Sequence, residues 1–234
     1  QDAAARESRR ALDLALGSAL SSLAARAAVN LARVAFRAGD ADAILGWVDI
    51  AAAHVDADPG SRARVEHMRA WGLYTAGRTV EALASFGTSL SLRRLAGDAA
   101  AIANELMNLG SLALERKDGQ AAGRYLAEAA ALCETMESVY TLAGLLGVLA
   151  ELASVKGRHA DAVALIGAAE AVHRECGLMP DPGDDRMAER IGSLAIAALG
   201  EEGMRAARTR GASLAGPERG ALIAAVVTGP DDPR

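Results

Sequence analysis

Aromatic residues are scarce in this chain. Two tryptophans, three tyrosines and two phenylalanines make up 3% of its 234 residues, whereas apolar residues together reach 51%. Alanine supplies much of that apolar content, and a core filled by alanine favours closely packed helices over sheets, which prefer branched and aromatic side chains. The composition therefore predicts an all-α protein with enough apolar residues for a sizeable core.

Sequence motifs of common enzymes are also missing. The only lysines, Lys117 and Lys156, do not follow a glycine, so the chain has no GxxxxGK[ST] phosphate loop. No serine lies in a GxSxG turn, and no serine, histidine and aspartate form a recognisable catalytic set. We therefore expect a protein that is not an enzyme and that needs no cofactor.

Cysteine and positive charge are limited as well. Cys133 and Cys176 are too few for a disulfide framework, which favours a reducing, cytoplasmic setting. The net charge of −5 argues against direct nucleic-acid binding and against binding to anionic membranes. The longest apolar run, residues 142–155, is interrupted by Glu151 and is shorter than the roughly 20 residues that cross a bilayer. The charged first residues do not resemble a signal peptide. Because the chain begins with Gln1, we expect it to be processed or to be part of a longer protein.

A repeat organises most of the chain. Four segments, residues 29–53, 66–90, 106–130 and 146–170, align on a turn between two helical patterns. The turn residues are Gly39, Gly77, Lys117 and Gly157, at spacings of 38, 40 and 40. Small residues precede each turn by seven positions, and small or apolar residues follow it by five, nine and twelve. Helices joined by a short turn approach within about 8–10 Å only when their crossing side chains are small, so the period indicates stacked helical hairpins.

This pattern resembles the tetratricopeptide repeat, lengthened beyond its usual ~34 residues. The resemblance implies an all-α, right-handed superhelix of helix-turn-helix units with a capping C-terminal hairpin. A plain helical bundle is the alternative, although it would not need the period. We predict a solenoid over residues 1–176, with a leading helix and four hairpins. A degenerate fifth hairpin around Gly200 and a capping helix would cover 177–227, and 228–234 would be disordered.

The segment 190–227 resembles the closing part of large actinobacterial ATP-binding transcriptional regulators. The resemblance rests on Leu199-Gly200-Glu201-Glu202, on Gly211 and on the alanine-rich helix that follows. In that family an ATPase of the STAND type precedes a tetratricopeptide-like region, often with a LuxR-type DNA-binding domain at one end. Met204 and Arg208 stand where the family usually has aromatic residues. The resemblance implies a sensor or scaffold arm of a regulator.

The histidines and cysteines give a weak metal signal. His173 lies three residues before Cys176, as two zinc ligands on one helix can, with Cys133 as a conceivable third. A surface histidine beside a buried cysteine explains the pair more simply. The carboxylate pairs Asp184-Asp185 and Glu201-Glu202 suit the positive ends of helices better than acid–base catalysis. We therefore expect no metal site.

The predicted concave face supplies the candidate binding residues. Arginine flanked by aromatic residues is typical of binding hot spots, and a row of arginines suits a carboxylate or an acidic peptide. The alternatives are that Trp71 only fills the core and that the arginines form a solvated face. The predicted partner-binding residues are Arg26, Arg33, Arg37, Arg64, His67, Trp71, Tyr74, Asn104, Met107, Asn108, Ser111 and Glu115.

Two glycines in the fourth hairpin, Gly144 and Gly147, should allow a close approach, because each costs about 0.5–1 kcal/mol relative to alanine inside a helix. Either a ligand or the helix predicted over 186–199 would lie there. We favour the helix, which would leave the face from Arg26 to Glu115 for a partner.

The leading interpretation is a non-catalytic protein-interaction and sensor module of a cytoplasmic bacterial transcriptional regulator. It would bind a protein, a peptide or a second copy of itself on its concave face. The alternative is a small-molecule receptor domain of such a regulator, with a pocket around Trp71 and Tyr74.

Overall fold

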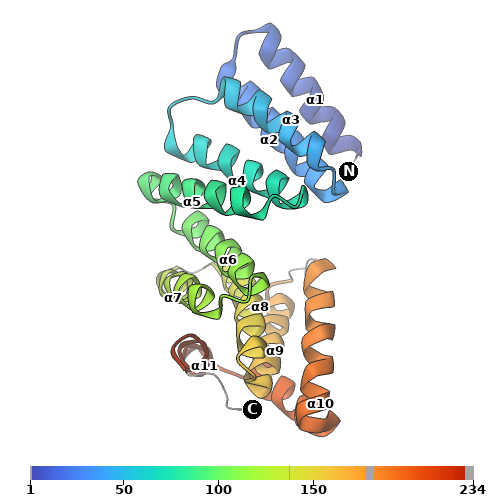
Figure 1. Cartoon of the computed structure of the whole chain (residues 1–234), viewed down its shortest axis with the longest axis vertical. Helices are drawn as coiled ribbons and strands as arrows, with labels where there is room; N and C mark the ends of the chain where they lie inside the picture. Colours follow the sequence, from blue (N-terminus) through green and yellow to red (C-terminus); the bar gives the residue numbers. More distant parts are fainter. Residues whose placement is uncertain (1, 137, 178–181, 230–234) are drawn as a thin grey trace. The chain divides into compact units, whose positions relative to one another are not determined.

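The structure, a computed structural model, describes residues 2–136, 138–177 and 182–229. Within these ranges the regular elements are eleven α-helices (Figure 1). The predicted all-α class is therefore confirmed. None of the helices in the described ranges combines the length and the apolar character that crossing a membrane requires.

The chain forms two compact units, Gln1–Glu105 and Leu106–Arg234. The first contains α1 (Asp2–Gly17), α2 (Ser21–Ala38), α3 (Ala41–His54), α4 (Pro59–Thr75) and α5 (Thr79–Ala96). The boundary lies inside α6 (Ala99–Glu115). The second contains α7 (Gly119–Thr135), α8 (Val139–Val155), α9 (His159–Cys176), α10 (Pro182–Ala212) and α11 (Gly216–Thr228). The predicted division at residue 176, between repeats and tail, stays a prediction.

Consecutive helices pack against each other through short turns. In the first unit α2 packs on α3 and α4 on α5, and in the second α8 packs on α9. The four predicted turn residues, Gly39, Gly77, Lys117 and Gly157, all have a left-handed backbone, with φ of +72°, +75°, +60° and +77°. Glycine adopts this conformation without a steric cost, which explains why it ends the first helix of a hairpin.

The positions that define the repeat are buried. Ala32, Ala70 and Ala150, seven residues before the turn, are 0% exposed. At the equivalent Gly110, a Cβ atom would lie 2.8 Å from Leu126 Cδ2. The residues five, nine and twelve positions after the turns are all buried: Ile44, Ala82, Ala122, Ala162, Val48, Phe86, Leu126, Ile166, Ala51, Ser89, Ala129 and Ala169. The predicted packing role of the period is thus confirmed.

Ile44 departs from the repeat, because the other hairpins have alanine at this position. Gly72 on α4 compensates for the larger side chain. A Cβ atom on Gly72 would lie 2.9 Å from Ile44 Cγ2 and 2.8 Å from Leu45 Cδ2. The missing side chain on α4 therefore makes room for the extra volume on α3.

Helices α3 and α6 each begin after an aspartate whose side chain caps the first turn. The side chain of Asp40 accepts a hydrogen bond from Ala43 N at 2.9 Å, and Asp98 accepts one from Ala101 N at 3.0 Å. Such bonds satisfy backbone N–H groups that have no partner inside the helix.

The C-terminal helices pack more closely than the repeats. α10 is interrupted at Gly200, where φ is +74° and ψ is 168°. Beyond this point it crosses α9 at two glycines: a Cβ on Gly211 would lie 1.8 Å from Ala164 O, and one on Gly167 would lie 2.1 Å from Arg208 O. The backbones of α9 and α10 are therefore in direct contact.

Part of the predicted tail cannot be compared with the structure. Within the predicted disordered segment 228–234, Thr228 ends α11, whereas residues 230–234 lie outside the described residues. Residues 178–181, inside the predicted segment 177–227, also lie outside them.

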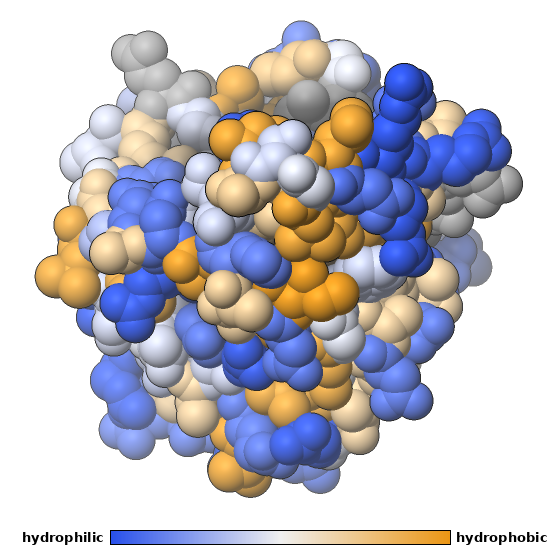
Figure 2. All heavy atoms as spheres, turned by 90° about the horizontal axis from the view of Figure 1, so that it is seen from above, coloured by the Kyte–Doolittle hydropathy of each residue, from blue (hydrophilic) through white to orange (hydrophobic). Residues whose placement is uncertain are grey.

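Apolar side chains also reach the surface, interspersed with hydrophilic ones (Figure 2). In the first unit they include Leu14, Leu16, Leu20 and Leu23 of α1, α2 and the turn between them. Singly exposed apolar residues are common on soluble proteins and do not by themselves mark a site.

Candidate binding face

The predicted binding residues divide between the two units. Those from Arg26 to Asn104 belong to the first unit, and Met107, Asn108, Ser111 and Glu115 belong to the second. Arg37 is exposed in the last turn of α2, and Asn104 is half-buried on α6.

Helices α2 and α4 form the wall of a surface cavity in the first unit. Its volume is about 510 Å³. The lining residues are Ser22, Ala25, Arg26, Val29, Asn30, Arg33, Val55, Asp56, Ser61, Arg64 and Val65. Three of the predicted arginines are thus brought together, with Asp56 as the acidic residue of the lining. The excess of positive charge suits an anionic group.

Local structure explains the placement of these arginines. Arg26 and Arg33 are seven residues apart on α2 and therefore lie on the same face two turns apart. Arg64 lies near the start of α4, where Asp58 caps the helix by accepting a hydrogen bond from Ser61 N at 2.7 Å. Arg64 Nη2 donates to Ser61 Oγ at 3.1 Å.

The acidic cap keeps its own charge. The pKa of Asp58 is lowered by the hydrogen bonds from the backbone and side chain of Ser61, with a smaller effect from the charge of Arg64. Asp58 is consequently ionised at neutral pH, and its carboxylate is hydrogen-bonded to the first turn of α4.

An aromatic cluster lies further along α2 and α4. The Trp71 ring lies 4.9 Å from that of Phe36, 5.4 Å from that of Phe86 and 5.7 Å from that of Tyr74, measured between centroids. Phe86 is fully buried, whereas Trp71 and Tyr74 are half-buried and Phe36 is 36% exposed. Trp71 therefore contributes to the core and also keeps part of its surface exposed. We call the cavity and this cluster the α2–α4 face.

His67 forms hydrogen bonds inside the protein that the sequence did not predict. Trp71 Nε1 donates to His67 Nε2 at 3.1 Å, which places the imidazole proton on Nδ1. That proton is then donated to Glu105 Oε2 at 2.8 Å. His67 thus links the aromatic cluster to α6.

Glu105 is a charged residue in the core of the first unit. Its side chain is 0% exposed, and Arg93 Nε lies 3.8 Å from its Oε2. Burial alone would raise the pKa of Glu105, but hydrogen bonds from His67 and Ser89 and the charge of Arg93 together lower it. The sequence signal was a glutamate with apolar residues on its helix face, at Ala101, Ile102 and Leu109.

The predicted residues of the second unit are less accessible. Met107 is buried, and its Cε lies 3.7 Å from where a Cβ on Gly144 would be. The expectation that Met107 is an exposed groove residue is therefore wrong, because α8 covers it. Asn108 and Ser111 are half-buried, and Glu115 is exposed at a cavity of about 340 Å³ that α10 also lines.

Helix α10 packs against α8 near Gly147, as the sequence analysis favoured for the helix predicted over 186–199. A Cβ on Gly147 would lie 3.3 Å from Met187 Cε, and Arg190 forms an ion pair with Glu151 of α8. The close approach predicted at Gly147 is therefore made by the chain's own helix.

The thiols and carboxylates do not form a reactive centre in the described part of the chain. There, no three histidine, cysteine, aspartate or glutamate side chains lie close enough to hold a metal ion. Burial raises the pKa of the Cys133 thiol to about 11, so it is protonated at neutral pH and is a poor nucleophile and metal ligand.

The helical hairpins and their packing define a tetratricopeptide-like repeat protein. No protein-family model and no curated protein matches the sequence. Among solved structures, the chain is similar to the crystal structure of BtubC (BKLC) from P. vanneervenii, with a TM-score of 0.66 and 16% sequence identity. The similarity covers 100% of this chain and 94% of that chain. It shows the fold: an all-α protein whose helices pack sequentially in pairs, as in tetratricopeptide-like structures.

Proposed function

We propose that this chain is a non-catalytic interaction module that binds an acidic protein or peptide segment on its α2–α4 face. The observation that carries the proposal is the convergence of Arg26, Arg33 and Arg64 on one cavity. Guanidinium groups pair with carboxylates through two parallel hydrogen bonds, which makes them suitable for acidic partners. The partly exposed rings of Trp71 and Tyr74 add apolar contact area further along α4.

The test is a binding titration with a fluorescein-labelled, glutamate-rich peptide of about ten residues. The variant Arg33→Gln/Arg64→Gln removes two charges from the cavity. Because hydrogen bonds to charged groups contribute about 1.5–3 kcal/mol each, its affinity should fall at least tenfold. Arg62→Gln is the matched control, since Arg62 is exposed on the same helix but does not line the cavity. Equal affinities for the wild type and the double variant would refute the proposal.

A small-molecule receptor is the second candidate. The cavity volume of about 510 Å³ falls within the range of small-ligand sites, about 300–1,000 Å³. Its lining contains arginines and not Trp71 or Tyr74, around which the sequence placed the pocket, so an anionic metabolite fits this cavity. A thermal-shift screen separates the two candidates, because a metabolite that binds the cavity raises the Tm of the wild type and not that of Arg33→Gln/Arg64→Gln.

We also propose that the module serves a cytoplasmic bacterial transcriptional regulator, as its sensor or scaffold arm. Support comes from the resemblance at Leu199–Glu202 and Gly211, together with a repeat fold suited to binding proteins. In the structure Gly200 forms the interruption of α10 and Gly211 forms the contact with α9, so packing also accounts for both glycines. Reading the gene on both sides of this coding segment tests the regulator proposal: a phosphate-loop motif in the same reading frame supports it, and a complete frame without one opposes it.

A further inference from the structure

Helix α11 is held in the second unit with little apolar burial. It contacts α7, α8 and α9, and among its described side chains only Ile223 and Val226 are buried. It has 13 residues, and isolated helices of about this length are marginal in water. Its attachment therefore depends on further contacts.

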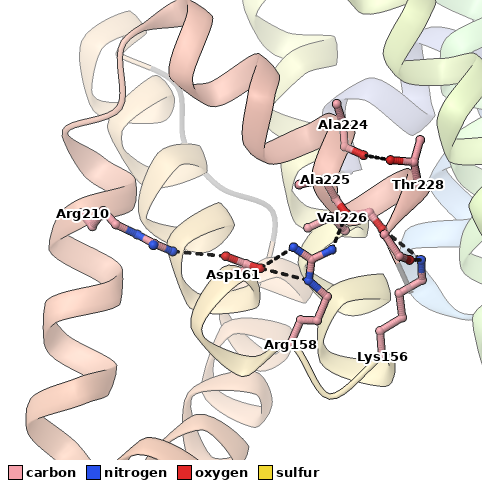
Figure 3. Close-up of polar contacts among 9 residues, drawn as sticks. Lys156, Arg158, Asp161, Arg210, Ala224, Ala225, Val226 and Thr228 are labelled. Carbon is pink, nitrogen blue, oxygen red and sulfur yellow. Dashed lines mark hydrogen bonds and ion pairs between the residues drawn. The ribbon is translucent and has the colours of Figure 1, made fainter. Parts of the chain in front are cut away.

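Those contacts are made by two cations in the turn between α8 and α9. Lys156 Nζ donates to Val226 O at 3.0 Å and to Gly229 O at 2.9 Å, and Arg158 Nη1 donates to Ala225 O (Figure 3). The last carbonyls of a helix have no partner inside it and form the negative end of its dipole. We call Lys156 and Arg158 the carbonyl clasp.

The clasp is held in place by neighbouring charges. Asp161 Oδ2 accepts from Arg158 Nε at 3.0 Å and from Nη2 at 2.7 Å, and its Oδ1 accepts from Arg210 Nη2 at 3.2 Å (Figure 3). The second repeat has an equivalent pair, in which Arg78 bonds to Glu81. The side chain of Arg78 is 50% exposed and donates two hydrogen bonds to Glu81. It therefore serves as a matched control for Arg158.

We infer that the clasp and the adjoining faces of α7, α8 and α9 form a second binding surface, built for the C-terminal end of an amphipathic helix. Helix α11 is its occupant in this structure. Cations that bind backbone carbonyls recognise an open helix end, and the two buried residues three positions apart, Ile223 and Val226, supply the apolar part. Val227 O lies 3.9 Å from where a Cβ on Gly123 of α7 would be, an ordinary van der Waals distance, so α7 and α11 are adjacent here.

The first test is native-state hydrogen exchange on the full chain. In Lys156→Gln/Arg158→Gln, the amides of α11 should exchange at least tenfold faster than in the wild type, while those of α8 and α9 change little. Arg78→Gln should leave exchange in α11 unchanged. Unchanged exchange of α11 in the double variant would overturn the inference, as would wild-type α11 protection equal to that of α8.

The second test supplies the occupant as a separate peptide. The variant Ile223→Ser/Val226→Ser weakens the docking of α11 but keeps both cations of the clasp. A labelled, amidated peptide copying residues 213–229 should bind this full-length variant at least tenfold more tightly than the wild type. Adding Lys156→Gln/Arg158→Gln should abolish binding, with the far-UV helix signal retained. Equal binding to wild type and variant, or binding that persists without the clasp cations, would contradict the inference.

Discussion

Lys117 occupies a turn position at which the other three repeats have glycine. Its φ of +60° places a side-chain-bearing residue in the left-handed region, which costs roughly 1–2 kcal/mol. We expect Lys117→Gly to raise the free energy of unfolding by about 0.5–1 kcal/mol, after allowing for the greater flexibility of glycine in the unfolded chain. Urea denaturation measures the change.

The matched control for this substitution is Gly77→Ala. Gly77 has φ of +75°, and a Cβ there would meet no atom within 4 Å. The loss expected for this variant, about 1 kcal/mol, is therefore purely conformational. If Lys117→Gly were less stable than the wild type, the contacts of the lysine side chain would stabilise the fold by more than its backbone strain costs.

Glu105 makes the stability of the first unit depend on pH. Its pKa is lowered in the folded state, so its contribution to stability is present above the unfolded value of about 4.3 and is lost as pH falls through the folded value. At pH 7 we expect Glu105→Gln to lower the free energy of unfolding by about 1–3 kcal/mol, because it leaves buried donors poorly paired.

The difference between wild type and Glu105→Gln should shrink as the pH falls below the unfolded value of about 4.3 and towards the lowered folded pKa of Glu105. Chemical denaturation at a series of pH values between 7 and 3 measures it. A difference that stays constant over that range would mean that the charge of Glu105 does not contribute.

At the scale of elements, the contact between α9 and α10 depends on two glycines. An alanine Cβ at Gly167 or Gly211 would fall 2.1 or 1.8 Å from a backbone oxygen, which cannot rotate away as a side chain can. We expect each substitution to alanine to lower the free energy of unfolding by about 2–3 kcal/mol, as overpacking does. Thermal or urea unfolding provides the measurement.

Gly192 on α10 is the control for these substitutions. A Cβ at this position would meet no atom within 4 Å. Gly192→Ala should therefore stabilise the helix by about 0.5–1 kcal/mol, the ordinary gain over glycine in a helix. If all three alanine variants changed the free energy of unfolding by the same amount, the close contact of α9 and α10 would not determine the effect of the substitutions.

The hairpins could be predicted because their determinants are local. A left-handed turn residue and small residues at fixed offsets recur in the sequence, and Gly39 and Ala32 show both features in the first repeat. The contact of Gly211 with Ala164 and the bonds of Lys156 to α11 join positions far apart in the chain. No periodicity encodes such contacts, because they depend on how a completed helix lies on its neighbours.

The same limit applies to the candidate site. Helical spacing was sufficient to place Arg26 and Arg33 on one face, and they share a cavity with Arg64. Spacing could not show that His67 forms a hydrogen bond with Glu105, since the two residues come from different helices. It also could not show that Met107 is covered by α8, which depends on the packing of a later hairpin.

For the whole molecule, the charge is negative while the cavity of the α2–α4 face is rich in arginine. The net charge is −5, so an acidic peptide is repelled at long range and attracted only near Arg26, Arg33 and Arg64. Salt screens both effects over a distance of about 10 Å at 0.1 M. Because contact between charged groups is far closer than this, the local attraction should dominate the affinity.

We therefore expect the Kd of the acidic peptide to rise several-fold between about 0.05 and 0.3 M salt, as short-range ion pairs are screened. In Arg33→Gln/Arg64→Gln the net charge changes from −5 to −7, and the same salt increase should leave the Kd unchanged or lower it, because repulsion then dominates. Arg62→Gln should keep the wild-type slope. Fluorescence anisotropy over this salt series measures the three slopes. A wild-type Kd that does not change with salt would mean that the arginine cavity does not bind the peptide's carboxylates.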